Sequence, residues 1–278
     1  MTLHARADLH VHSRFSNRPT EWFLERVGAP ESYTDPLVVY RRCREREMTL
    51  VTLTDHDTID GALEIAHLPG TFLSCEVTVR FPEDGCPFHC LVFGIDERQH
   101  RDIQGLRDDV YELRDYLYDH RIAHSVAHPL FGVDRRLRLE HVEKLLVLFK
   151  CFEGLNGAHD ARQSMVTRAV LNNLTARQLD ELANRHDLDP RDDEPWRKHL
   201  TAGSDDHCGL YVASAWSSVQ AEGPMSAGRF LEQLRSGELS IEGAAGSSLK
   251  LGRGLHRIAA RYARTRCSGD DGAMQLLA

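Results

Sequence analysis

The segment ADLHVHS, residues 7–13, places two histidines one residue apart in a run that otherwise reads as a strand. Side chains two positions apart on a strand point to the same face, so His10 and His12 are directed at one point. Two imidazoles that converge on a point make half of a metal site. The other ligands of such a site have to come from elsewhere in the chain.

The composition fits a globular protein with a buried core, in one large α/β domain or two small ones. The chain has 278 residues, is 41% hydrophobic and 27% charged, and carries a formal net charge of −8. An acidic balance is atypical of a general nucleic-acid binder. It leaves room for an enzyme that binds an anionic substrate through metal ions.

The cysteines and the apolar runs indicate the compartment. None of the seven cysteines sits in a Cys-x-x-Cys pair, which favours reduced thiols over a disulfide framework or a zinc ribbon. The N-terminus has no apolar signal core, and the aliphatic run at 145–149 is too short to cross a bilayer. A cytoplasmic protein without a membrane span is predicted.

Short apolar segments alternate with longer helical patterns. Asp35 and Pro36 mark the start of one helix, a single charged helix is predicted from about residue 98 to about 120, and a helical stretch covers 160–186. Repeated β–α alternation predicts an α/β fold whose parallel sheet closes, or nearly closes, into a barrel. The predicted strands are ADLHVHS, TLVTLTDHD, TFLSCEV, FHCLVFGI, IAHSVAHP, KCFEGLNG and HLTAGSDDH.

Residue types that bind metals lie at the carboxyl ends of these strands, which form the active-site face of β/α barrels. His89, near the beginning of its strand, is the exception. Imidazole and carboxylate together suit zinc, manganese or iron, and two neighbouring ions can bind the attacking water and the leaving oxygen of a phosphoester. The residues at the strand ends are His10, His12, Asp55, His56, Glu76, His128, Asp205 and His207.

The order of these motifs resembles that of the PHP family, named after polymerase and histidinol phosphatase. The motifs are DLHVHS, TLTDHDTIDGA, SCEVT, FHCLVFGI, VAHP and GSDDH, and the resemblance spans residues 7 to 220. It implies a distorted (β/α)7 TIM-like barrel over residues 1–245, with the metal site at the C-terminal face of its strands. It also implies two or three divalent ions, Zn, Mn or Fe, used for phosphoester hydrolysis.

The resemblance also implies a role for each motif residue. Glu76 would bridge the first two ions, while Asp8 and Asp55 would orient neighbouring ligands. The metal-bound water would act as nucleophile, and no separate general base is assigned. The ligands implied are His10, His12, Glu76 and Asp205 for the first ion, Glu76, His89 and His128 for the second, and His56 and His207 for the third.

The chain departs from the family pattern in two places. Asn17 stands where relatives commonly carry an acidic residue or a histidine that completes the third site, so two firmly held ions and one weakly held ion are predicted. The stretch 19–34 is an insertion that contains Trp22, Phe23 and Tyr33. It either shapes the substrate pocket or forms a surface loop packed by its own aromatics.

Four further residues are candidate substrate contacts. Arg14 could pair with a phosphate oxygen, and Asn156, His159 and Arg162 follow a strand near the predicted mouth. Residues 246–278 read as a basic amphipathic helix and tail, with apolar residues at helical spacing. This helix either packs on the barrel or contacts an acidic partner, anionic lipid or RNA.

The sequence thus predicts a metal-dependent phosphoesterase that acts on a small phosphorylated substrate. A nuclease for short oligonucleotides should show a basic track to the mouth, and the sequence has none outside the tail. An amidohydrolase would need a strand lysine as a metal bridge, and none is found at a corresponding place. A non-catalytic metal-binding or regulatory module is the third alternative. The nearly complete ligand set counts against it, because a module without catalytic function could lose its ligands.

Overall fold

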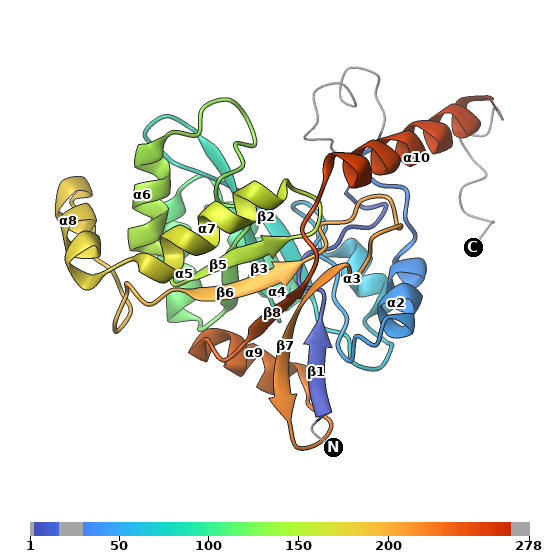
Figure 1. Ribbon diagram of the computed structural model, residues 1–278, viewed down its shortest axis with the longest axis horizontal. Coiled ribbons are helices and arrows are strands. Elements are labelled where there is room, and N and C mark those ends of the chain that lie inside the picture. The colour runs from blue at the N-terminus through green and yellow to red at the C-terminus, as the bar shows by residue number, and fades with distance from the viewer. Residues whose placement is uncertain (1–2, 17–29, 268–278) are drawn as a thin grey trace.

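A computed structural model describes residues 3–16 and 30–267 and shows an α/β fold with two sheets (Figure 1). The α/β prediction is therefore confirmed. The strands of the five-stranded sheet are, in spatial order, β2 (Ser74–Arg80), β3 (Pro87–Phe93), β4 (Ala123–Val126), β5 (Cys151–Asn156) and β6 (His199–Gly203). Those of the three-stranded sheet are β1 (Leu3–Ala7), β7 (Ala215–Ala221) and β8 (Ser240–Gly243).

Helices connect and cover these strands. In Figure 1, α5, α6 and α7 lie beside the five-stranded sheet and α10 projects from the opposite side of the molecule. No helix among the described residues is long and apolar enough to cross a membrane. The helices are α2 (Pro36–Glu45), α3 (Asp60–Ile65), α4 (Glu97–Leu106), α5 (Val110–Asp119), α6 (Leu139–Leu148), α7 (Ala161–Asn173), α8 (Ala176–His186), α9 (Ala227–Ser236) and α10 (Ser248–Cys267).

The prediction of an all-parallel sheet is correct for β4, β5 and β6 and wrong for β2 and β3. β2 pairs antiparallel with β3, and β3 pairs antiparallel with β4. A six-residue turn joins β2 to β3, with Gly85 at φ 70°, and so short a connection cannot carry a parallel crossover. The helices α4 and α5 join β3 to β4, and β4 begins beside the end of β3.

Two predicted helical stretches are each divided in two. The helix expected from 98 to 120 is interrupted because Asp109 caps a new helix: its carboxylate accepts from the Tyr111 and Glu112 N–H groups at 2.8 and 3.2 Å. Thr175 caps α8 in the same way and divides the stretch 160–186. The predicted start of α2, with Asp35 as cap and Pro36 in the first turn, is confirmed.

Single bridges form where the histidines lie. Val11, after β1, bridges Asp206, after β6, and His56 bridges Glu76 of β2, both in the parallel sense. Within residues 3–16 and 30–267, continuous ladders do not close into a barrel. The segment TLVTLTDHD, predicted as a strand, contributes isolated bridges. The division of the chain at residue 245 stays a prediction.

The apolar core packs around the strands that carry the functional residues. Its largest cluster packs the five-stranded sheet against α5 and α6, with Phe149 and Phe152 fully buried. A second cluster packs Phe230 of α9 against Leu9 and Phe93. Both clusters fix the strands whose ends carry the functional residues.

Asp8 fastens the end of β1 to the loop after β6. One carboxylate oxygen accepts from the Ser204 and His10 N–H groups at 2.8 and 3.2 Å, and the other accepts from Ser204 Oγ and the Ala213 N–H at 2.5 and 2.7 Å. Burial raises the pKa of Asp8 to about 6, against these hydrogen bonds. The carboxylate was expected to orient neighbouring ligands, and this role stays a prediction; its contact with a predicted ligand is the hydrogen bond from the His10 N–H.

We expect Asp8→Asn to lower the free energy of unfolding by about 2–4 kcal/mol, because one amide nitrogen would face two buried donors. Urea denaturation followed by circular dichroism measures this change. Asp60→Asn, at an exposed position, is the matched control and should change stability by less than about 0.5 kcal/mol. Equal stability of the two variants would show that Asp8 does not fasten this loop.

Candidate metal centre

The histidines predicted as ligands converge at the carboxyl ends of β4, β5 and β6. His128 lies two residues after β4, while His10 and His12 lie beyond β1 on a stretch that hydrogen-bonds to residues 202–206. His89 reaches the same place from the start of β3 because β3 runs antiparallel to β4; its carbonyl accepts from the Ala127 N–H. The exception in the sequence pattern is thus explained by strand direction.

Glu76 stands at the centre of this group and is fully buried. Its Oε2 lies 3.2 Å from His10 Nε2, 3.2 Å from His12 Nε2 and 3.1 Å from His56 Nδ1. Its Oε1 lies 2.9 Å from His89 Nδ1 and 3.1 Å from His128 Nε2. One carboxylate therefore faces five imidazoles, divided between its two oxygens.

Asp205 completes the first set of converging atoms. Its Oδ1 lies 3.3 Å from both His10 Nε2 and His12 Nε2, the same two atoms that face Glu76 Oε2. His10, His12 and Asp205 can each offer an atom to one ion. Two imidazoles and two carboxylates thus surround one point.

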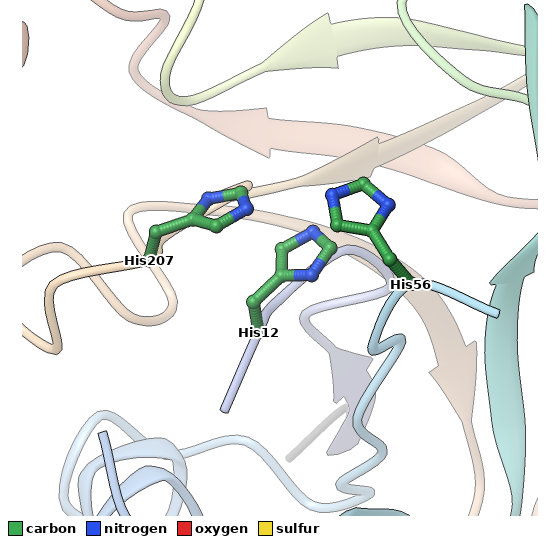
Figure 2. A group of neighbouring side chains, drawn as sticks. All are labelled: His12, His56 and His207. Atoms are coloured by element: carbon green, nitrogen blue, oxygen red, sulfur yellow. The ribbon is translucent and has the colours of Figure 1, made fainter. Parts of the chain in front are cut away.

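His89 and His128, which face Glu76 Oε1, make a second set. A third set, formed by His12, His56 and His207, lies beside the first (Figure 2). Figure 2 shows His12, His56 and His207, carried by three separate segments, with their rings gathered together. The rings of His12 and His207 stack with centroids 3.9 Å apart, and the His56 ring lies 4.7 Å from that of His12. Their nitrogen atoms lie close enough together to hold one ion.

Hydrogen bonds fix the orientation of the two inner histidines. His10 Nδ1 lies 2.9 Å from Glu153 Oε1, an acceptor, so Nδ1 carries a proton and Nε2 is directed to the centre. His12 Nδ1 lies 2.8 Å from Ser16 Oγ, which itself donates to Asp55 Oδ1 at 2.8 Å. His12 must therefore donate from Nδ1, and Asp55 orients it through Ser16.

The charges of the cluster are strongly coupled. Burial alone would raise the pKa of Glu76, but the neighbouring histidines, His10 first, hold it well below its usual range. Burial opposes a charge on His10, yet Asp205 and Glu76 hold its pKa well above the usual value. For His12 burial again lowers the pKa, but close contacts with the same two carboxylates raise it to about 10. The carboxylates therefore draw positive charge into the cluster.

Several nitrogen and oxygen atoms of the cluster are poorly satisfied by protein groups alone. Within the described residues, His10 Nε2, His12 Nε2, both nitrogens of His89 and His207 Nε2 are buried and lack a hydrogen-bond partner. Such buried atoms are unfavourable unless something compensates them. Atoms that face one another at 3.1–3.3 Å without hydrogen-bond geometry are the pattern expected of ligands around a shared cation.

The backbone is adapted to this packing. A Cβ at Gly203 would lie 2.2 Å from His10 Cβ and 2.4 Å from His10 N, so only glycine lets β6 approach His10. His128 and Asp205 have positive φ values of 26° and 50°. Non-glycine residues with such backbones cluster at functional sites, where the surrounding structure holds the strain.

The four candidate substrate contacts have different positions. His159 lines the cavity above the cluster, with its Nε2 3.4 Å from Asp205 Oδ2. Asn156 is buried and donates to Glu153 and Asp205 at 2.9 and 3.0 Å. Arg14 forms ion pairs with Asp35 and Glu64, and Arg162 is exposed on α7; neither lines the described cavity.

The cavity has a volume of about 240 Å³ and one wall is part of α10. Leu251, Leu255 and Ile258 of this helix line it, together with Tyr211 and Phe131. Ile258 is buried against Cys208. The C-terminal helix therefore packs on the protein in part, through Ile258, as one of the two predicted alternatives had it, while Leu249 and Leu251 are exposed. Its contact with a partner stays a prediction.

Three residues near the centre were missed from the sequence. Glu153 orients His10 and also accepts from the His128 N–H at 2.9 Å. Its signal was a lone carboxylate inside the apolar strand CFEGLN. Ser16 and Glu31 carried no such signal. Asn17, Trp22 and Phe23, together with most of the predicted insertion, lie outside the described residues.

No family model matches the chain. Among curated proteins, an uncharacterized protein of Methanocaldococcus jannaschii is 31% identical over 67 residues, which are 24% of this chain. The match spans only 37% of that relative's length.

Solved structures match most of the chain. PsfC from Pseudomonas syringae is 13% identical with a TM-score of 0.52, over 94% of this chain and 99% of its own. A two-domain protein from Bacteroides vulgatus, containing a predicted PHP-like metal-dependent phosphoesterase, is 13% identical with a TM-score of 0.53, over 92% of this chain and 70% of its own. The chain thus shares the α/β fold of a PHP-like protein and has buried histidine-rich clusters, which confirms the resemblance seen in the motifs.

Proposed function

We propose that this chain is a metal-dependent phosphoesterase of the PHP type. The observation that carries the proposal is Glu76, a buried carboxylate that presents one oxygen to His10, His12 and His56 and the other to His89 and His128. This is the arrangement of a carboxylate that bridges two metal ions. An isolated buried carboxylate would need no such ring of imidazoles.

The distances support shared ions. Ligand atoms bound at about 2.0–2.2 Å to one ion lie about 2.9–3.5 Å from one another. Most of the separations around Glu76 and Asp205 fall in this range, from 2.9 to 3.3 Å. Zinc, manganese and iron all accept this mixture of imidazole and carboxylate.

The proposed ligand sets follow from the convergence of atoms. His10, His12, Glu76 and Asp205 would hold the first ion, Glu76, His89 and His128 the second, and His56 and His207 the third. Ions held there would supply an activated water and would offset the charge of a phosphoester.

The protein's own residues prepare the site. Glu153 and Ser16 hold His10 and His12 with Nε2 directed inward. Asn156 fixes Asp205, and His159 lies beside Asp205 at the cavity wall, where it can bind a substrate oxygen. Apolar residues of α10 line one part of the cavity, whose volume of about 240 Å³ suits a small phosphorylated substrate.

Two finer predictions stay within this proposal. We infer that the two sheets form the distorted (β/α)7 barrel, which the bridge between Val11, after β1, and Asp206, after β6, supports. The proposed cytoplasmic location rests on reduced thiols. Six buried cysteines are free, namely Cys43, Cys75, Cys86, Cys90, Cys151 and Cys208.

The activity is tested by phosphate release from a nucleoside monophosphate and a sugar phosphate, and by gel analysis of the cleavage of a short oligonucleotide, with protein resupplied with Mn²⁺ or Zn²⁺. We expect hydrolysis of a small monoester. Glu76→Gln should lower kcat by more than about 100-fold, which exceeds the usual effect of mutating a residue that only hydrogen-bonds to a metal ligand. Glu97→Gln, at an exposed position, is the control and should keep full activity.

Other outcomes separate the alternatives. Cleavage of the oligonucleotide alone would identify a nuclease. A folded, metal-loaded protein without turnover on any substrate would favour the non-catalytic binding module and contradict the proposed function.

Glu153→Gln should weaken metal binding about 10- to 100-fold, because its amide nitrogen would face the donors of His128 and Asn156 and His10 would lose its charged partner. Isothermal titration with Mn²⁺ measures the effect, and thermal melting checks the fold. Glu238→Gln, an exposed position, provides the comparison. Unchanged affinity in Glu153→Gln would refute its orienting role.

Metal affinity should rise with pH. The pKa of His12 is about 10 without metal, so at neutral pH this imidazole holds a proton that metal must displace. His10, whose pKa is also held well above its usual value, holds a second proton, and each displaced proton makes binding about 100-fold tighter at pH 8 than at pH 6. Titrations in two buffers of different ionisation enthalpy count the protons released. Equal affinity at both pH values, without proton release, would contradict this linkage.

A further inference from the structure

The end of the predicted insertion returns to the metal centre and is held there by backbone hydrogen bonds. The Arg14 N–H donates to the Thr34 carbonyl at 2.7 Å, and the Ser32 N–H donates to the Ser16 carbonyl at 3.3 Å. Ser32 Oγ also accepts from the Thr34 N–H at 3.2 Å. Residues 30–34 are thereby fixed alongside the segment that follows His12.

This attachment places the side chain of Glu31 among the histidines. Glu31 is only 5% exposed and lines the cavity. Its Oε2 lies 3.4 Å from His56 Nε2, and its Oε1 lies 3.7 Å from His207 Nε2. Its two carboxylate oxygens thus face two of the three histidines of the third set.

The geometry fits ligands of a shared ion better than direct hydrogen bonds. N–H···O bonds are usually 2.7–3.2 Å long, and both separations exceed that range. Two ligands of one ion are held about 3–3.5 Å apart, close to the values found. The His56 ring is available for this contact because its other nitrogen, Nδ1, faces Glu76.

We propose that Glu31 is a ligand of a third metal ion, together with His56 and His207. This rests on the proposed function and deepens it, because a third ion was predicted to be weakly held. The carboxylate comes from the end of the insertion, about fourteen positions after Asn17, and replaces the ligand that Asn17 does not supply. The end of the insertion would then complete the metal centre by supplying one carboxylate ligand.

The test counts metal ions instead of measuring activity. Full-length protein is stripped with a chelator and titrated with Mn²⁺, and bound metal is measured by elemental analysis and calorimetry. We expect three ions per chain in the wild type and two in Glu31→Gln, with the affinities of the remaining two within about threefold. His207→Ala should lose the same ion and no other.

Controls make each outcome decisive. Glu64→Gln removes an exposed carboxylate that pairs with Arg14 beside the same segment, and it should keep three ions. Thermal melting verifies that Glu31→Gln, which keeps the side-chain shape, is folded; if it is not, Glu31→Asp takes its place, with the third ion bound more weakly than in the wild type.

The two proposals fail in different ways. Three ions in both the wild type and Glu31→Gln, with equal affinities, would overturn the role of Glu31 and leave the phosphoesterase intact. Two ions in the wild type would overturn the third site. A wild-type chain that binds no metal would overturn both proposals.

Discussion

The structure depends on a buried negative charge, the carboxylate of Glu76. Taking such a charge out of water is strongly unfavourable unless nearby groups compensate it. Five imidazoles surround it at 2.9–3.2 Å, and a cation shared between them would compensate it more fully than neutral rings can. Much of the fold can be understood as the means of bringing these rings to one carboxylate.

The strand directions follow from that requirement. β2 carries Glu76, and its antiparallel neighbour β3 delivers His89 from its first residues, while β4 delivers His128 from beyond its last. The extension of β1 carries His10 and His12 against the end of β6, where Gly203 permits the close approach. Antiparallel and parallel strands can therefore share one site, because what matters is the edge at which each ligand leaves the sheet.

The sequence predicted much of the centre and less of the fold. The histidines could be found because metal ligands at strand ends form a local pattern, and the motif order resembles that of a known family. The direction of β3 depends on how short its turn to β2 is, and the division of the long helix depends on Asp109, one polar residue among many. Glu31 could not be found, since its place depends on hydrogen bonds that join Ser16 to Ser32 and Arg14 to Thr34, pairs 16 and 20 residues apart.

The charges around the cavity bear on what the site can bind. Of the side chains described as lining it, Lys250 is the one lysine or arginine, and its ammonium group donates to the carbonyls of Ala244 and Ala245, both at 3.1 Å. Carboxylates line the same cavity, among them Glu31, Glu76 and Asp205. A phosphate would be repelled by such walls in the absence of cations. Binding of an anionic substrate at this site therefore requires bound metal cations, so the proposed substrate and the proposed metal centre depend on each other.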